Sequence, residues 1–200
     1  MRLLAAALLL FATGCATSPP QNVDNICSIF REKDDWYEDA ADARDEWGSS
    51  IPVMMAIIHQ ESRFVAKAKP PRRKILGFIP GPRPSSAYGY SQAKKTTWSE
   101  YKRSAGRYGA DRDDFGDAID FVGWYNYQSK RRSGISRADP YSLYLAYHEG
   151  HGGFNRGTYK GKPWLMQVAR KVERRAGAYQ SQLNSCEEDL VDDGWFFGWF

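Results

Sequence analysis

The chain has 200 residues, 42% of them hydrophobic and 26% charged, with a formal net charge of +4. This length provides one ordinary domain with its own core, and so mild a charge does not indicate nucleic acid as a partner. The three cysteines and three histidines lack the spacing of a metal site, so we expect no metal and no other cofactor.

Residues 1–14 have the layout of a secretory signal peptide: Arg2, an apolar run and then small residues before Cys15. The run is too short to span a bilayer, which takes about 20 residues. The site resembles the lipobox of bacterial lipoproteins, in which the cysteine carries lipid; an ordinary signal peptide cut near Ala16 is the alternative. In Gram-negative lipoproteins, an Asp directly after the lipid-bearing cysteine is typical of retention in the inner membrane. This chain has Ala16 there, which favours the outer membrane as its location. We therefore expect a periplasm-facing lipoprotein with its lipid anchor and tether over residues 15–23.

After the tether, two helices are predicted before residue 63. Residues 24–47 predict an amphipathic helix, because apolar side chains recur every three to four positions. Ser50 is a suitable cap for the next helix, and Pro52 suits its first turn. Residues 53–58 are apolar on every side, so this second helix should be buried.

Five prolines between residues 67 and 86 predict a loop without regular structure. Helices follow over residues 96–106, 115–132 and 139–149, ending at the glycines that begin with Gly150, and a long last helix starts at Pro163. No stretch shows the sustained alternation of apolar and polar residues that is typical of a β-strand. The predicted fold class is therefore mainly α: a single helical domain over residues 24–190 and an aromatic tail over 191–200. The tail either folds back onto the domain or lies against a membrane or partner.

Cys27 and Cys186 lie near the two ends of the mature chain. An oxidising compartment favours a disulfide between them, and two free thiols are the alternative. Such a bridge would stabilise the domain by roughly 4–5 kcal/mol in the chain-entropy account. Basic residues cluster over 67–74 and 160–175; they form either a solvated surface or sites for the carboxylates of a ligand.

Glu61 follows the apolar part of the second helix, residues 53–58, with only His59 and Gln60 between. Burial would raise the pKa of this carboxyl and keep it protonated near neutrality, which a glycosidic general acid requires. The alternative is an ordinary surface glutamate at a helix end.

Three segments carry a family resemblance: Ile57–Phe64, Ala87–Gln92 and Leu145–Gly152. They resemble the Glu-Ser, Gly-Leu-Met-Gln and Ala-Tyr-Asn-Ala-Gly segments of lytic transglycosylases of glycoside hydrolase family 23, whose SLT domain shares the goose-type lysozyme fold. The order is that of the family, and the resemblance covers about residues 50–180. It implies a protein that acts on peptidoglycan glycan strands, and the carboxylates of their peptide stems are then the candidate ligands of the basic clusters. We expect the protein to be a monomer.

The resemblance implies roles residue by residue. Glu61 matches the catalytic acid/base, and the implied substrate-binding residues are Ser62, Ser85 or Ser86, Gly89, Gln92, Tyr147 and His148. Tyr147 matches the tyrosine whose hydroxyl approaches the glutamate, and His148 replaces the family's asparagine. Between the first two motifs lies an insertion, residues 69–84, that either covers the groove or rides on the surface.

The implied reaction needs one carboxyl group. Glu61 protonates the bond between N-acetylmuramic acid and N-acetylglucosamine and then takes a proton from the muramyl 6-hydroxyl, which closes a 1,6-anhydro ring. The second carboxylate of ordinary glycosidases is not required. Two alternatives stay open: a lysozyme-like muramidase, with Glu149 as second acid, and a non-catalytic, glycan-binding envelope lipoprotein.

Overall fold

The computed structural model describes residues 18–72 and 74–196, so the predicted signal peptide and Cys15 lie outside the described residues. The chain is mainly helical, which confirms the predicted fold class. The elements in chain order are α1 (Ile26–Glu32), α2 (Trp36–Trp47), α3 (Ile51–Ser62), β1 (Lys74–Ile75), β2 (Ile79–Pro80), α4 (Lys95–Ser104), α5 (Phe115–Ser133), α6 (Pro140–Asn155), the 3-10 helix η1 (Thr158–Gly161), α7 (Pro163–Leu183) and α8 (Glu187–Phe196).

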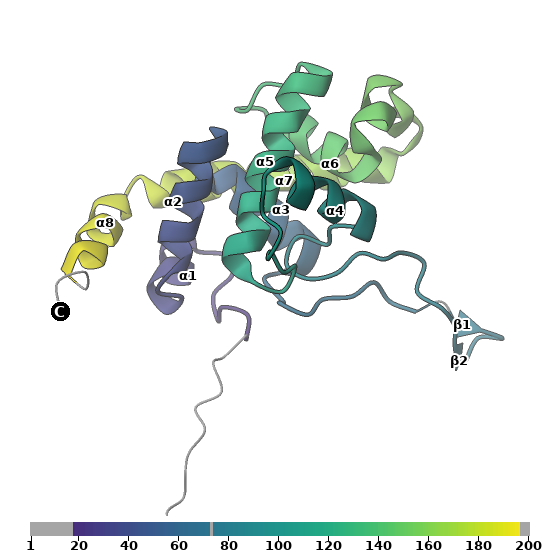
Figure 1. Cartoon of the computed structure of the whole chain (residues 1–200), viewed down its shortest axis with the longest axis horizontal. Coiled ribbons are helices and arrows are strands. Elements are labelled where there is room, and N and C mark those ends of the chain that lie inside the picture. Colours follow the sequence, from purple (N-terminus) through teal and green to yellow (C-terminus); the bar gives the residue numbers. More distant parts are fainter. Residues whose placement is uncertain (1–17, 73, 197–200) are drawn as a thin grey trace, which may run out of the picture.

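The central element is α3, which packs against α5 and α7 within the helical body (Figure 1). Its residues 51–59 are all buried, as its continuous apolar sequence predicts. Ser50 occupies the N-cap position without a side-chain cap bond, and Pro52 lies in the first turn. The helix ends because Arg63 and Phe64 adopt left-handed conformations, with φ of 52° and 61°. The fully buried Phe64 ring holds this unfavourable backbone in place.

The single helix expected over residues 24–47 is two helices, and that prediction was wrong. The backbone becomes extended at Lys33, where α1 ends, and α2 begins at Trp36. The turn lets the Trp36 ring stack on Phe115, with centroids 3.7 Å apart. Aromatic packing on a distant helix therefore overrides a periodicity that runs through the break.

The segment between α3 and α4 contains a short antiparallel hairpin, which corrects the expectation of a loop without regular structure. Strands β1 and β2 pair Ile75 with Ile79, and Leu76 and Gly77 turn the chain with φ of 52° and 80°. The hairpin projects away from the helical body (Figure 1). Its apolar tip lies open, since Leu76 is 78% and Phe78 75% exposed.

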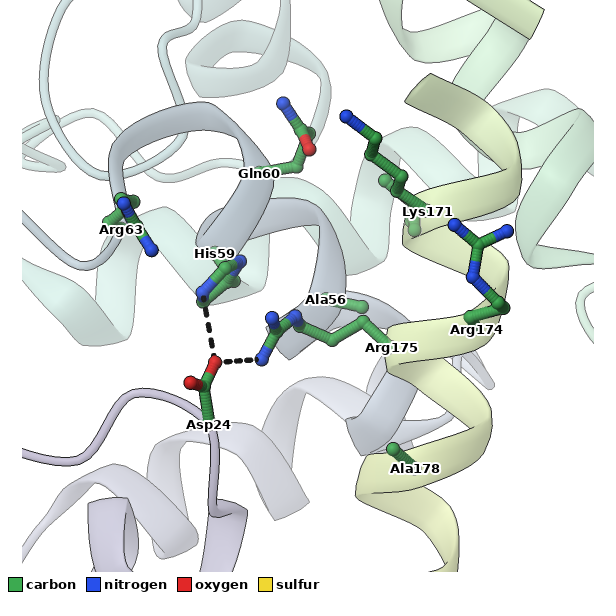
Figure 2. A pocket seen from close by; sticks show the side chains of 10 residues that line it. Asp24, Ala56, His59, Gln60, Arg63, Lys171, Arg174, Arg175 and Ala178 are labelled. Carbon is green, nitrogen blue, oxygen red and sulfur yellow. Dashed lines mark hydrogen bonds and ion pairs between the residues drawn. The ribbon is translucent and has the colours of Figure 1, made fainter. Parts of the chain in front are cut away.

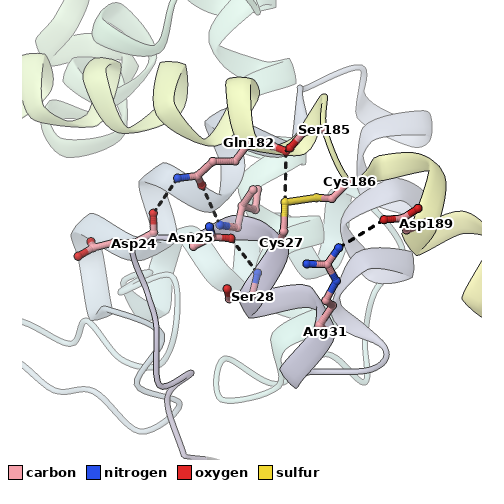
Figure 3. Close-up of a disulfide and its surroundings, with 10 residues drawn as sticks. Asp24, Asn25, Cys27, Ser28, Arg31, Gln182, Ser185, Cys186 and Asp189 are labelled. Atoms are coloured by element: carbon pink, nitrogen blue, oxygen red, sulfur yellow. Dashed lines mark hydrogen bonds and ion pairs between the residues drawn. A yellow bond between two sulfur atoms is a disulfide. The ribbon is translucent and has the colours of Figure 1, made fainter.

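The chain entering α1 is fixed to α7. Asp24 accepts a hydrogen bond of 2.6 Å from Arg175 (Figure 2). The Gln182 side chain accepts from the Ile26 amide at 3.0 Å and donates to the Asp24 carbonyl at 3.1 Å (Figure 3). The N-terminal segment thus lies against the last long helix although more than 150 residues separate them in sequence.

A disulfide joins Cys27 of α1 to Cys186, which lies between α7 and α8 (Figure 3). This confirms the predicted pairing. Helix α8 extends to Phe196, so the predicted boundary between domain and tail at residue 190 falls inside a helix. In the described part of the chain no helix is both long and apolar enough to cross a membrane.

Candidate active site

A cavity of about 440 Å³ lies where α3 ends, between α5 and α6. The segment that leads into α4 forms another wall. The residues that line this groove are Glu61, Pro70, Ser85, Ala87, Gln92, Ala93, Lys94, Thr97, Phe121, Tyr125, Tyr147, His148, Glu149 and Gly150. Residues from all three predicted motifs therefore meet in one place. The inserted segment contributes Pro70 at its base, while its hairpin lies at the far end.

Glu61 stands on the last turn of α3 at the wall of the groove. Burial raises the pKa of its carboxyl from 4.5 to about 7, and the Tyr144 hydroxyl partly opposes the rise by hydrogen bonding to the charged form. No cation contributes to the shift. A carboxyl with this pKa carries a proton for part of the time at neutral pH and can both give and take one.

Two tyrosines of α6 approach Glu61, and they differ in what their hydroxyls do. The Tyr147 hydroxyl donates to the Ser91 carbonyl at 2.6 Å, and its ring packs edge-on against Tyr125, with centroids 5.0 Å apart. Burial, followed by the charge of Glu61, raises the pKa of both tyrosines, but only the Tyr144 hydroxyl also lowers the pKa of Glu61. The sequence motif indicated Tyr147 for this contact. Tyr144 lies three residues earlier on the same helix face, which is the signal that points to it.

Gly89 and Gln92 build the wall beside Glu61. Gly89 has φ of 79°, and a Cβ at this position would lie 1.8 Å from the Arg112 carbonyl oxygen, so only glycine fits. The Gln92 side-chain amide donates to the carbonyls of Ala68 and Gly89, at 3.0 and 2.8 Å. Gln92 thereby fixes the segment that leads into α4 and also lines the groove. Gly89 does not line the groove and contributes only to the packing of this segment.

The three candidate serines occupy different places. Ser85 lines the groove, and its hydroxyl accepts from the Ala87 amide at 3.0 Å. The Ser86 hydroxyl accepts from the Lys95 amide at 3.2 Å, at the start of α4. Ser62 is buried and donates to the Ile58 carbonyl at 3.3 Å within its own helix. Of the three, only Ser85 belongs to the groove lining.

Glu149 lies on α6, next to a kink where Gly150 leaves helical geometry with φ of 72°. Only 4% of its side chain is exposed. Lys162 donates to both of its oxygens, at 2.7 and 2.9 Å, and Thr158 donates a further bond. The hydrogen bonds from Lys162 and Thr158 lower the pKa of Glu149 to about 2. This carboxylate is therefore charged throughout the neutral range.

His148 is the more open neighbour of this ion pair. Its Nδ1 lies 3.2 Å from Glu149 Oε1, and its ring packs edge-on against Trp164, with centroids 5.2 Å apart. It lines the groove and can exchange hydrogen bonds with a ligand. Within the described residues, no group of three or more histidine, cysteine, aspartate or glutamate side chains is placed to hold a metal ion.

The groove thus combines one carboxyl that can exchange a proton near neutrality, one carboxylate that is charged at neutral pH, and aromatic and polar side chains around them. A family model described as Transglycosylase SLT domain matches residues 3–186. That range contains every residue of the groove. No curated protein and no solved structure matches the chain.

Proposed function

The chain belongs to the transglycosylase SLT domain family, and on that premise we propose that it is a peptidoglycan lytic transglycosylase in which Glu61 acts first as acid and then as base. It cleaves the bond between N-acetylmuramic acid and N-acetylglucosamine without consuming water. The observation that carries this proposal is the contrast between the two carboxyls of the groove. Only Glu61 has a pKa near neutrality, about 7.

The protonated Glu61 donates to the glycosidic oxygen, and the bond from that oxygen to the anomeric carbon breaks. The carboxylate left behind is stabilised by the Tyr144 hydroxyl, which hydrogen bonds to the charged form. It then takes the proton of the muramyl 6-hydroxyl, whose oxygen bonds to the anomeric carbon and closes the 1,6-anhydro ring. Glu61 ends the cycle protonated, so no second acid is needed.

The other groove residues hold the glycan in register. Ser85, Gln92 and His148 offer polar atoms toward the groove, and Tyr147 with Tyr125 forms an aromatic wall suited to the apolar face of a sugar ring. Ser62, Ser86 and Gly89 support the site from behind.

We further propose that the protein works as a monomeric lipoprotein of the outer membrane, facing the periplasm. The signal-peptide layout of residues 1–14 and the lipobox-like surroundings of Cys15 support this proposal. The disulfide between Cys27 and Cys186 suits an oxidising compartment. Mass spectrometry of the mature N-terminus tests it: a diacylated or triacylated Cys15 is expected, and an unmodified N-terminus near Ala16 would contradict it.

The reaction is tested by digesting purified peptidoglycan and weighing the released muropeptides. We expect 1,6-anhydro products from the parent protein and none from Glu61→Gln. Products heavier by one water would instead identify a lysozyme-like muramidase. Binding of glycan without any product, equal in parent and variant, would identify a non-catalytic envelope protein.

A further inference from the structure

A second cavity lies on another side of α3 (Figure 2). Its volume is about 670 Å³, and it is bounded by the last turn of α3, by α7 and by Asp24. Ala56, His59 and Gln60 leave α3 on other sides than Glu61, because successive helix residues are rotated by about 100°. No residue lines both this cavity and the groove.

The lining of this cavity is strongly cationic. Four of its side chains are basic, namely Arg63, Lys171, Arg174 and Arg175, and Asp24 is its one acid. Asp24 is already bound to Arg175, at 2.6 Å. Lys171 and Arg174 are exposed and form no ion pair within the described part of the chain. The cavity therefore presents an excess of positive charge and guanidinium donors to whatever enters it.

His59 adds an independent observation. Its side chain is buried in the cavity wall, with 8% of the residue exposed, and its Nε2 has no hydrogen-bond partner among the described residues. The nearest acid, Asp24, lies 4.0 Å from that nitrogen. Burial, followed by the charges of Arg175 and Arg63, lowers the pKa of His59 to about 4. A buried polar atom without a partner requires an explanation, and an anion held by the neighbouring cations can supply the missing hydrogen bond.

We propose that this cavity binds carboxylates of the peptide stems that peptidoglycan carries, an inference that rests on the proposed function. Guanidinium groups match carboxylates in geometry as well as charge. Gln60 lines the cavity and its chain neighbour Glu61 lines the groove, and a helix with its side chains is about 10–12 Å across. Three to four residues of an extended stem span that distance.

The test measures affinity with a Glu61→Gln protein, so that no ligand is consumed. The ligands are a short glycan with its stems, the same glycan stripped of its stems, and inorganic phosphate. The cavity variant carries Lys171→Gln and Arg174→Gln. The control variant carries Arg103→Gln of α4 and Arg170→Gln of α7, both exposed and outside the two cavities. It therefore loses the same charge elsewhere.

We expect the stem-bearing glycan to bind several-fold more tightly than the stripped glycan, and the cavity variant to lose about tenfold in affinity for the stem-bearing form alone. The control variant should keep the preference. Equal binding of the two glycans, or equal losses in both variants, would overturn the inference. So would a cavity-dependent affinity for phosphate without any preference for stems.

Failure of the proposed function is a separate result. It would appear as the absence of anhydro products from the parent protein. A stem-dependent affinity that the cavity variant loses would stand in that case too, because the binding assay needs no turnover.

Discussion

Two carboxyls line the same groove and are held in opposite states. Glu61 lies at the end of an apolar helix, where burial raises its pKa to about 7. Glu149 lies beside the kink of α6, where Lys162 and Thr158 lower its pKa to about 2. The difference comes from the neighbours that each backbone supplies, since the side chains are identical. One is suited to proton exchange and the other to fixing structure by charge.

The neighbours follow from the elements that carry the two residues. Residues 51–59 of α3 are all buried, and the pKa of Glu61 is set by burial with no contribution from a cation. The kink at Gly150 instead turns the chain so that Thr158 and Lys162, which follow within 13 residues, return to Glu149. We therefore expect the two groups to respond differently to the same substitution.

The largest expected effect is on turnover. Glu61→Gln should lower the rate of muropeptide release by about 10²–10⁴-fold, the usual contribution of a general acid/base. Glu149→Gln should lower it by less than about tenfold. The matched pair is measured on one peptidoglycan preparation. If Glu149→Gln abolished release as completely as Glu61→Gln, the assignment of a single acid/base would fall, and a two-carboxyl hydrolase would replace it.

The second effect is on stability. Glu149→Gln should lower the free energy of unfolding at pH 7 by about 1–3 kcal/mol, because charged hydrogen bonds to a buried group are lost. The stability from Glu149 should be fully present above its ordinary pKa of 4.5 and should disappear as pH falls toward about 2, since the folded pKa is depressed. Urea titrations across this range measure it.

A double-variant cycle provides the control. Adding Lys162→Met to Glu149→Gln should cost much less than the sum of the single changes. Additive costs would show that the two side chains are not coupled.

Sequence reasoning succeeded where one local signal decided the outcome. The apolar run of α3 predicts its burial, and with it the raised pKa of Glu61. The three motif segments predict that distant parts of the chain meet in one groove. The sequence predicts the pairing of Cys27 with Cys186 from the cysteine count and from the compartment that we expect.

Prediction from the sequence failed where contacts between residues far apart in the chain determine the structure. The break between α1 and α2 depends on Trp36 finding Phe115 on another helix. The state of Glu149 depends on Lys162, which the sequence separates from it by a kink and a 3-10 helix. The hydroxyl that lowers the pKa of Glu61 is that of Tyr144, whereas that of Tyr147, three positions later on the same helix, donates to the Ser91 carbonyl. Pattern alone left these partners undetermined.

The third effect is that Glu61→Gln, which should abolish turnover, should make the folded protein more stable at alkaline pH. The folded pKa of Glu61 is raised, so its ionisation costs stability as pH rises from 4.5 to about 7. At pH 8 the Glu61→Gln variant should therefore unfold at a higher temperature than the parent protein. A gain of about 1 kcal/mol in the free energy of unfolding corresponds to a rise of a few degrees in Tm. The difference should vanish near pH 4.5. A variant less stable than the parent at pH 8 would contradict the raised pKa.

The smallest expected effect separates the two tyrosines near Glu61. Tyr144→Phe removes the hydroxyl that stabilises the charged carboxylate, so the pKa of Glu61 should rise further. The alkaline limb of kcat/KM, which reports the protonated acid in the free enzyme, should then move upward by less than about one pH unit. Tyr147→Phe is the matched control, because its hydroxyl is committed to the Ser91 carbonyl. In the Tyr147→Phe variant the alkaline limb of kcat/KM should stay at the pH of the parent protein, even if turnover falls. A limb that moves with Tyr147→Phe and not with Tyr144→Phe would return the contact to the tyrosine that the sequence motif indicates.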